Sequence, residues 1–248
     1  MNHNYYLIRR KHGVRRMRLR SWNKLPGFMR TPEIRPYYDT LCKHRVSLVL
    51  KRLFDVFVSL IILLVLWPFM LIIAIVIKLD SPGSALFTQE RVTTYGKRFR
   101  IWKYRTMVSD AEKKGSSVTV KGDSRITRVG MFLRNKRLDE LPQLVNILVG
   151  DMSFVGTRPE VVKYVDKYQP VYYATLLLPA GVTSEASIRY KDEYKLLTEA
   201  DDVDRVYLEE VLPAKMKWNL ESIERFRFLR EILTMSRTVL AVLGKEYH

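Results

Sequence analysis

The most uneven distribution of hydrophobic and polar positions lies at residues 53–77, LFDVFVSLIILLVLWPFMLIIAIVI, where Asp55 is the only charged residue. A helix that is apolar on every face over this length is typical of a membrane segment rather than of a soluble core. The run begins too far into the chain for a secretory signal peptide, and no small-residue cleavage site follows it. We therefore expect residues 46–79 to form a membrane helix.

Two arrangements of this helix in the membrane stay open. Residues 53–77 reach roughly 37 Å as a straight helix, enough to cross a hydrocarbon core of about 30 Å. Pro68, however, removes a backbone hydrogen bond near the middle and bends the helix. Lysines and arginines flank both ends of the run, and such residues favour the cytoplasmic side. A re-entrant helix hairpin broken at Pro68 is our prediction, and a kinked single span is the alternative.

Alternating apolar and polar residues in KRFRIWKYRTM, residues 97–107, predict a strand with Phe99 and Ile101 on one face. Residues 85–104 are expected to form a β-hairpin that turns near Gly96. Residues 108–125 are polar and predict a mobile loop.

A helical pattern runs over residues 126–149 and ends before Gly150, a residue that suits a helix C-terminus. The segment GDMSFVGTRPE predicts a loop that leads into a helix from about Glu160. A final helix, at about 214–243, has one apolar face. We interpret this face as core packing, and contact with a membrane surface is the alternative.

The charge of the chain restricts its partners. A formal net charge of +17 favours an anionic partner, which is nucleic acid, a phosphorylated metabolite or an anionic membrane. Residues 1–52 hold 14 lysines and arginines against two acidic residues, so we expect residues 1–45 to be a basic N-terminal extension that is attracted to anionic membrane lipids. The single cysteine, Cys42, excludes an intrachain disulfide. The four histidines lie outside patterned segments, so catalysis must rest on carboxylates and cations.

The stretch LRNKRLDELPQL, residues 133–144, places the adjacent carboxylates Asp139 and Glu140 after three cations. If a helix begins here, its N–H groups and dipole favour an anion such as phosphate, and Arg134 adds to this attraction. Asp139 would then attack phosphorus or hold a metal ion. The alternative is that Asp139 only caps the helix and Glu140 is an acid of its first turn. Arg158, in GTRPE, is a second candidate for phosphate binding.

Several segments together resemble one family. KRLFDVFVSLIILLVLWPFMLIIAIVIKLDSPGSALFTQER, GKRFRIWKYRTM, DSRITRVGMFLRNKRLDELPQLVNILVGDMSFVGTRPE and LLPAGVTSEASIRYKDE are similar to the bacterial sugar transferases, the monotopic phosphoglycosyl transferases. The resemblance runs from about Lys51 to the C-terminus. It implies an α+β, mainly α fold, with a re-entrant membrane helix hairpin and a catalytic domain at 80–248 that contains a small β-hairpin. That domain is expected on the cytosolic face of the bacterial inner membrane.

The activity implied by the resemblance is transfer of a sugar 1-phosphate from a UDP-sugar to a polyprenyl phosphate, usually undecaprenyl phosphate. UMP is released, and the step begins glycan assembly at the membrane. Asp139 matches the nucleophile, which would carry a covalent phosphosugar intermediate and place Mg²⁺, the family's cofactor. Glu140 matches its dyad partner. The expected substrate-binding cations are Arg134, Arg158, Lys103 and Arg105.

This sequence departs from the family pattern at several positions. Trp67 precedes Pro68 where serine is usual, Thr93 stands where glycine is common, and Thr157 replaces a proline. These departures leave the identity of the transferred sugar undetermined. The sequence does not determine the oligomeric state either. Two other functions remain as alternatives: a membrane-anchored basic module that binds nucleic acid or lipid without catalysis, and an anchored hydrolase of UDP-sugars. The chain has no stacked-aromatic or groove-reading motif, so we expect no nucleic acid partner.

Overall fold

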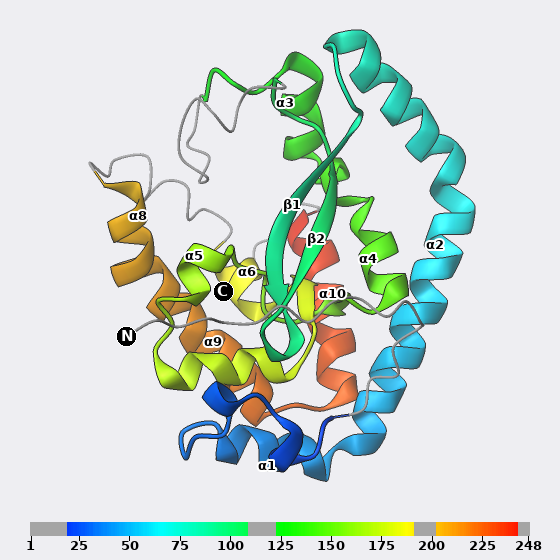
Figure 1. Cartoon of the computed structure of the whole chain (residues 1–248). Coiled ribbons are helices and arrows are strands. Elements are labelled where there is room, and N and C mark those ends of the chain that lie inside the picture. Colours follow the sequence, from blue (N-terminus) through cyan, green and yellow to red (C-terminus); the bar gives the residue numbers. More distant parts are fainter. Residues whose placement is uncertain (1–18, 109–122, 191–201, 243–248) are drawn as a thin grey trace.

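The computed structural model describes residues 19–108, 123–190 and 202–242. A mainly helical body surrounds two small sheets, which agrees with the predicted α+β class. The long helix α2, Arg45–Asp80, bows along one side of this body from α1 to α3 (Figure 1). The predicted loop at 108–125 lies almost entirely outside the described residues.

The predicted hairpin is confirmed. Strands β1, Leu86–Thr93, and β2, Lys97–Tyr104, pair antiparallel. Phe99 and Ile101 are buried on the inner face of β2, while Trp102 on the outer face is 36% exposed. The turn requires Gly96, because its φ is +74° and a Cβ there would lie 2.9 Å from the ring of Phe28.

The sequence analysis did not predict a second sheet. Strand β3, Met152–Val155, pairs in parallel with β4, Ala180–Thr183, where a loop had been expected. A Cβ on Gly181 would lie 2.2 Å from backbone atoms of Gly156. The two backbone segments therefore approach each other at a distance that only glycine permits.

The helical pattern predicted over 126–149 is confirmed in part, because the segment is helical but divided into three short helices. Helix α3, Arg128–Asn135, is followed by a short 3-10 helix, Leu138–Glu140, and then by α4, Gln143–Val149. The interruption is at Arg137, whose φ of 57° is left-handed. Gly150, with φ of 86°, ends α4 as predicted.

The C-terminal region is also more divided than the pattern predicted. The helix expected at 214–243 is two helices, α9, Leu212–Glu224, and α10, Phe228–Val242. The apolar face is correspondingly divided, because Ile223 and Phe226 are buried in the core whereas Leu233 is 50% exposed. The remaining helices are short: α5, Val162–Val165; 3-10 helix Pro170–Leu177; α6, Glu185–Arg189; α8, Val203–Val206; and π-helix Tyr207–Val211.

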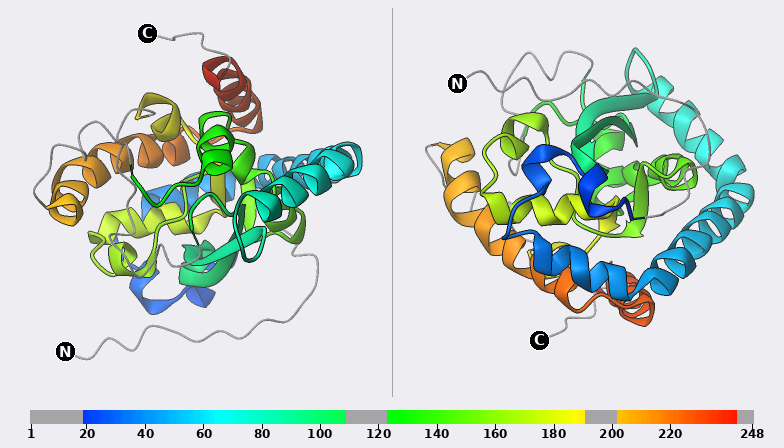
Figure 2. Two further views of the ribbon diagram at one scale, coloured as in Figure 1. Left: turned by 90° about the horizontal axis from the view of Figure 1, so that it is seen from above. Right: turned by 60° about the horizontal axis from the view of Figure 1, so that its bottom comes forward.

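The described part of the basic N-terminal segment belongs to the same folded body as the two sheets. It forms 3-10 helices Trp22–Lys24 and Gly27–Met29 and helix α1, Arg35–Lys43, which lies beside α9 (Figure 2). Met29, Ile34 and Leu41 are fully buried in the largest hydrophobic cluster. Residues 19–43 are thus integral to the fold rather than a separate extension, because apolar side chains recur among the basic ones.

Helix α2 continues through Pro68, so two separate hairpin arms are not confirmed. By length and composition it could cross a membrane. Its outer face is apolar and exposed, with Phe57 at 66%, Leu64 at 65% and Trp67 at 60% exposure. The missing N–H of Pro68 is accommodated within the helix, whose bowed course is visible in Figure 1.

Both halves of α2 are fixed to the same body. In the first half Arg52 donates hydrogen bonds to the carbonyl oxygens of Ile147 and Leu148, at 2.7 and 2.8 Å. In the second half Ile73 and Ile77 are buried in a cluster with Ala85, Tyr104 and Leu133. The folded body therefore lies along the length of the helix.

Leu41→Ala tests whether α1 is part of the core. Truncating this fully buried side chain should lower the free energy of unfolding by about 2–5 kcal/mol. The exposed Lys43→Ala should change it by less than about 0.5 kcal/mol. Chemical unfolding in detergent micelles measures both, and an unchanged Leu41→Ala variant would mean that the N-terminal segment is a dispensable extension.

Candidate active site

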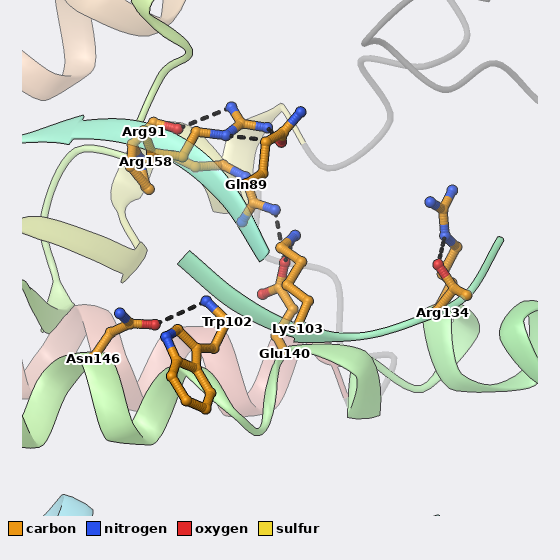
Figure 3. A network of polar contacts seen from close by, with 10 residues as sticks. Gln89, Arg91, Trp102, Lys103, Arg134, Glu140, Asn146 and Arg158 are labelled. Carbon is orange, nitrogen blue, oxygen red and sulfur yellow. Dashed lines mark hydrogen bonds and ion pairs between the residues drawn. The ribbon is translucent and has the colours of Figure 1, made fainter. Parts of the chain in front are cut away.

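Three elements bring oppositely charged side chains together at one end of β2. Asp139 and Glu140 come from the 3-10 helix, Lys103 from β2, and Arg158 from the loop after β3. The Nζ of Lys103 lies 3.1 Å, and Nη2 of Arg158 2.6 Å, from Oε1 of Glu140. Figure 3 shows these three side chains converging. The two predicted carboxylates and two of the four predicted cations thus share one site.

The dyad does not serve as a helix cap. Helix α4 has Pro142 at its N-cap position, and no side chain caps its first turn. The left-handed conformation of Arg137 turns the chain into the 3-10 helix that carries Asp139 and Glu140. The alternative in which Asp139 only caps a helix is therefore wrong.

Glu140 is held as a carboxylate. Burial alone would raise its pKa, but the charges of Arg158 and Lys103 outweigh burial and hold the pKa of Glu140 well below its usual value. The ion pairs use the same carboxylate oxygen. Glu140 is therefore charged, neutralised by its neighbours and fixed in position.

The carboxylate of Asp139 has different surroundings, although Asp139 is adjacent to Glu140 in the chain. It is 8% exposed, and its carboxylate forms no hydrogen bond or ion pair within the described part of the chain. Burial raises the pKa of Asp139, the charge of Glu140 raises it further, and Lys103 and Arg134 oppose this rise. Asp139 is thus the carboxylate of the dyad that is available for chemistry.

The remaining two predicted cations lie in other places. Arg134 donates from Nε to Oγ1 of Thr106 at 2.8 Å, and its charge acts on Asp139 without forming an ion pair with it. Arg105 donates to the carbonyl oxygens of Ser81 and Pro82, both at 2.6 Å. Arg105 therefore secures the C-terminal end of α2 instead of joining Lys103 at the dyad.

Comparison with known proteins gives the family. The model of the family described as "Bacterial sugar transferase" matches residues 46–245. The chain belongs to the bacterial sugar transferase family. This enzyme is therefore a phosphoglycosyl transferase, and the match begins within one residue of the start of α2.

Curated relatives of this sugar transferase carry names that agree with the family. A Bacillus subtilis protein named for undecaprenyl-phosphate N-acetylgalactosaminyl 1-phosphate transfer is 47% identical over 49% of this chain and 68% of its own length. The UDP-N-acetylgalactosamine-undecaprenyl-phosphate N-acetylgalactosaminephosphotransferase of Aeromonas hydrophila is 34% identical over 78% of this chain, which spans 44% of that protein. The UDP-glucose:undecaprenyl-phosphate glucose-1-phosphate transferase of Escherichia coli is 38% identical over 62% of this chain and 33% of its own length.

Asn146 positions two elements of the site, and the sequence analysis did not predict this role. Its Oδ1 accepts from the backbone N–H of Trp102 at 3.0 Å (Figure 3). Its Nδ2 donates to the carbonyl of Arg100 at 2.9 Å. These bonds fix α4, which follows the dyad, against β2, which carries Lys103. The available signal was a polar residue inside the apolar run LVNILV, buried to 2% exposure.

Arg91 is a second missed residue, and it supports the loop that carries Arg158. Its Nη1 donates to the carbonyl of Pro159 at 3.1 Å, and Nε and Nη2 donate to Oε1 of Gln89 at 3.1 and 2.6 Å. Figure 3 shows Arg91 and Gln89 above the ion pairs of Glu140. The guanidinium of Arg91 thus fixes the residue that follows Arg158.

The donor set of the transferase fits Mg²⁺ only as an ion shared with substrate. No group of three or more His, Cys, Asp or Glu side chains that could hold a metal ion occurs among the described residues. Mg²⁺ is commonly held by one or two carboxylates together with substrate phosphates and water. Asp139 would provide one such carboxylate, since no described side chain forms a hydrogen bond or ion pair with it.

The pH dependence of turnover tests the coupling within the dyad. Because the pKa of Asp139 is raised, activity should fall as the pH drops through that raised value and Asp139 becomes protonated. Glu140→Gln removes a negative charge that raises this pKa, so the acidic limb of the kcat/KM profile should move to lower pH, at a reduced overall rate. Glu90→Gln, at an exposed ion pair with Arg98, should leave the limb unchanged. An acidic limb that stays in place or moves upward in Glu140→Gln would contradict the coupling.

Proposed function

We propose that the protein transfers a sugar 1-phosphate from a UDP-sugar to undecaprenyl phosphate and releases UMP. The observation that carries this proposal is the difference between the two carboxylates: Glu140 is neutralised by two cations, whereas Asp139 has no hydrogen-bond or ion-pair partner among the described residues. The names of the relatives supply the substrate class. Because those names include two different sugars, they leave the sugar of this protein open.

The chemistry requires two displacements at one phosphorus atom. An oxygen of the Asp139 carboxylate attacks the phosphorus that is bonded to the sugar, the new O–P bond forms, and the bond from that phosphorus to UMP breaks. An oxygen of undecaprenyl phosphate then attacks the same phosphorus. The bond to Asp139 breaks, which restores the carboxylate and gives the lipid diphosphate-linked sugar.

The surrounding cations match the charge that moves in these steps. Lys103 and Arg158 lie beside the dyad, and Arg134 acts on Asp139 at longer range. Phosphoryl transfer depends on positioning and on neutralising phosphate oxygens. Mg²⁺, held by Asp139 together with substrate phosphates, would supply further neutralisation, and the second carboxylate oxygen would stay available for attack.

The position of α2 supports a membrane anchor that does not cross the bilayer. From Asp55 to Ile77 a straight helix would rise roughly 33 Å, about the thickness of the hydrocarbon core. Both residues are nevertheless buried against the same catalytic body, with Asp55 accepting from the N–H of Phe154 at 3.2 Å. We propose that α2 enters and leaves on the cytosolic face of the inner membrane, with its exposed apolar face in lipid.

Cysteine labelling tests this placement. In a Cys42→Ser background, Val46→Cys and Pro82→Cys put exposed thiols at the two ends of α2. Both should react with a membrane-impermeant maleimide only after the inner membrane is permeabilised. Leu64→Cys, on the exposed apolar face, is the control and should stay shielded by lipid in both conditions. Labelling of one end in intact spheroplasts would show that α2 crosses the bilayer.

Intact-protein mass spectrometry tests the covalent step. Wild-type protein incubated with a panel of UDP-sugars and Mg²⁺, without lipid acceptor, should gain the mass of one phosphosugar and release an equal amount of UMP. Asp139→Asn keeps the side-chain shape and removes the anionic nucleophile, so it should fold normally, form no adduct and lose turnover. An active Asn variant would refute the nucleophile. Repeated turnover of UDP-sugar to UMP and free sugar phosphate without added undecaprenyl phosphate would instead indicate a hydrolase. A wild-type protein that forms no adduct and releases no UMP with any UDP-sugar would indicate a binding module.

A further inference from the structure

A cavity of about 390 Å³ lies beside the loop that carries Arg158, between α9, α10 and the end of β3. One wall is formed by Gly156 and Thr157, the two residues that precede Arg158. The opposite walls come from the end of α9 and the first turns of α10. Its charged lining residues are Glu185, Arg189, Glu221, Arg225, Arg227, Arg230, Glu231 and Arg237.

The side chains that line this cavity carry more positive than negative charge, which favours binding of an anion. Each glutamate already has a cationic partner: Glu185 pairs with Arg237, Glu221 with Arg225, and Glu231 with Lys51. Arg189 stacks over the ring of Trp218 at 3.9 Å. Within the described residues, Arg227 and Arg230 form no ion pair, and both line the cavity. Two guanidinium groups of this kind match the oxygens of a phosphate.

The cavity also lies next to the proposed membrane anchor. Phe228 of α10 packs edge-on against Phe54 of α2, with ring centroids 5.9 Å apart. Leu229 and Leu233, on the same helix as Arg230, are 78% and 50% exposed. The arginines therefore stand between an apolar surface that continues from α2 and the loop that carries Arg158.

We propose that this cavity receives the phosphate of the polyprenyl acceptor, with Arg227 and Arg230 binding its oxygens and Leu229 and Leu233 contacting its chain. The inference rests on the proposed function. The acceptor carries a phosphate on an apolar chain, and it arrives from the membrane after UMP has left. A site that combines two guanidinium groups, neither in an ion pair with a described residue, with the exposed leucines of α10 fits both parts of that molecule.

The first step, in which Asp139 takes the phosphosugar and UMP leaves, tests the proposed function. The second step, transfer to undecaprenyl phosphate, tests the acceptor site. Arg227→Gln/Arg230→Gln should form the phosphosugar adduct and release the first equivalent of UMP from UDP-sugar at the wild-type rate. Its KM for undecaprenyl phosphate in neutral detergent micelles should rise at least tenfold. Arg227→Lys/Arg230→Lys keeps the charge but not the bidentate geometry and should give an intermediate KM. Arg35→Gln/Arg98→Gln removes two exposed, paired charges elsewhere and should match wild type in both steps.

Each other outcome overturns the acceptor assignment. An unchanged KM for undecaprenyl phosphate in the glutamine variant would show that the arginines do not bind the acceptor. Loss of the UMP burst in the folded glutamine variant, or in the lysine variant, would show that the cavity serves the nucleotide donor. Absence of the burst in the wild-type protein would refute the proposed function itself.

Discussion

The Oε1 atom of Glu140 accepts from both Lys103 of β2 and Arg158 of the loop after β3, so one oxygen joins three elements at the dyad. Removing either cation would leave a buried carboxylate less compensated, a change that costs about 3–5 kcal/mol in other buried pairs. The same contacts give the two carboxylates of the dyad different roles. Glu140 is held as a fixed charge, whereas its neighbour Asp139 has a raised pKa and no partner in the part of the chain that the structure describes.

The membrane helix supports the same arrangement from outside. Arg52 binds the last carbonyl groups of α4, whose first residues follow the dyad, and Lys51 donates to the carbonyl of Val155 at the end of β3. A cation at a helix C-terminus is stabilised by the helix dipole. The polar residues that begin α2 thus connect the anchor to both segments that build the site, which explains why charges are buried at the start of an apolar helix.

Local patterns predicted some of this structure well. The alternation around Phe99 and Ile101 predicted β2. The segment LRNKRLDELPQL marked Asp139 and Glu140, and GTRPE separately marked Arg158, which the structure places against Glu140. Features set by tertiary contacts were not predicted. Arg137 adopts a left-handed conformation without the usual glycine signal, and Arg105, two residues after Lys103, turns instead to the end of α2. The basic composition of the N-terminal segment obscured the apolar residues that place α1 in the core.

The central claim is that Asp139, and not Glu140, forms the bond to phosphorus. An acyl phosphate is cleaved by hydroxylamine to a hydroxamate on the carboxyl group that carried it. Wild-type protein incubated with the active UDP-sugar and Mg²⁺ is treated with hydroxylamine and digested, and the peptide that begins at Leu138 is sequenced by tandem mass spectrometry. The account predicts a hydroxamate on Asp139 and none on Glu140. A hydroxamate on Glu140, or none on either residue of a protein that has released UMP, would contradict it.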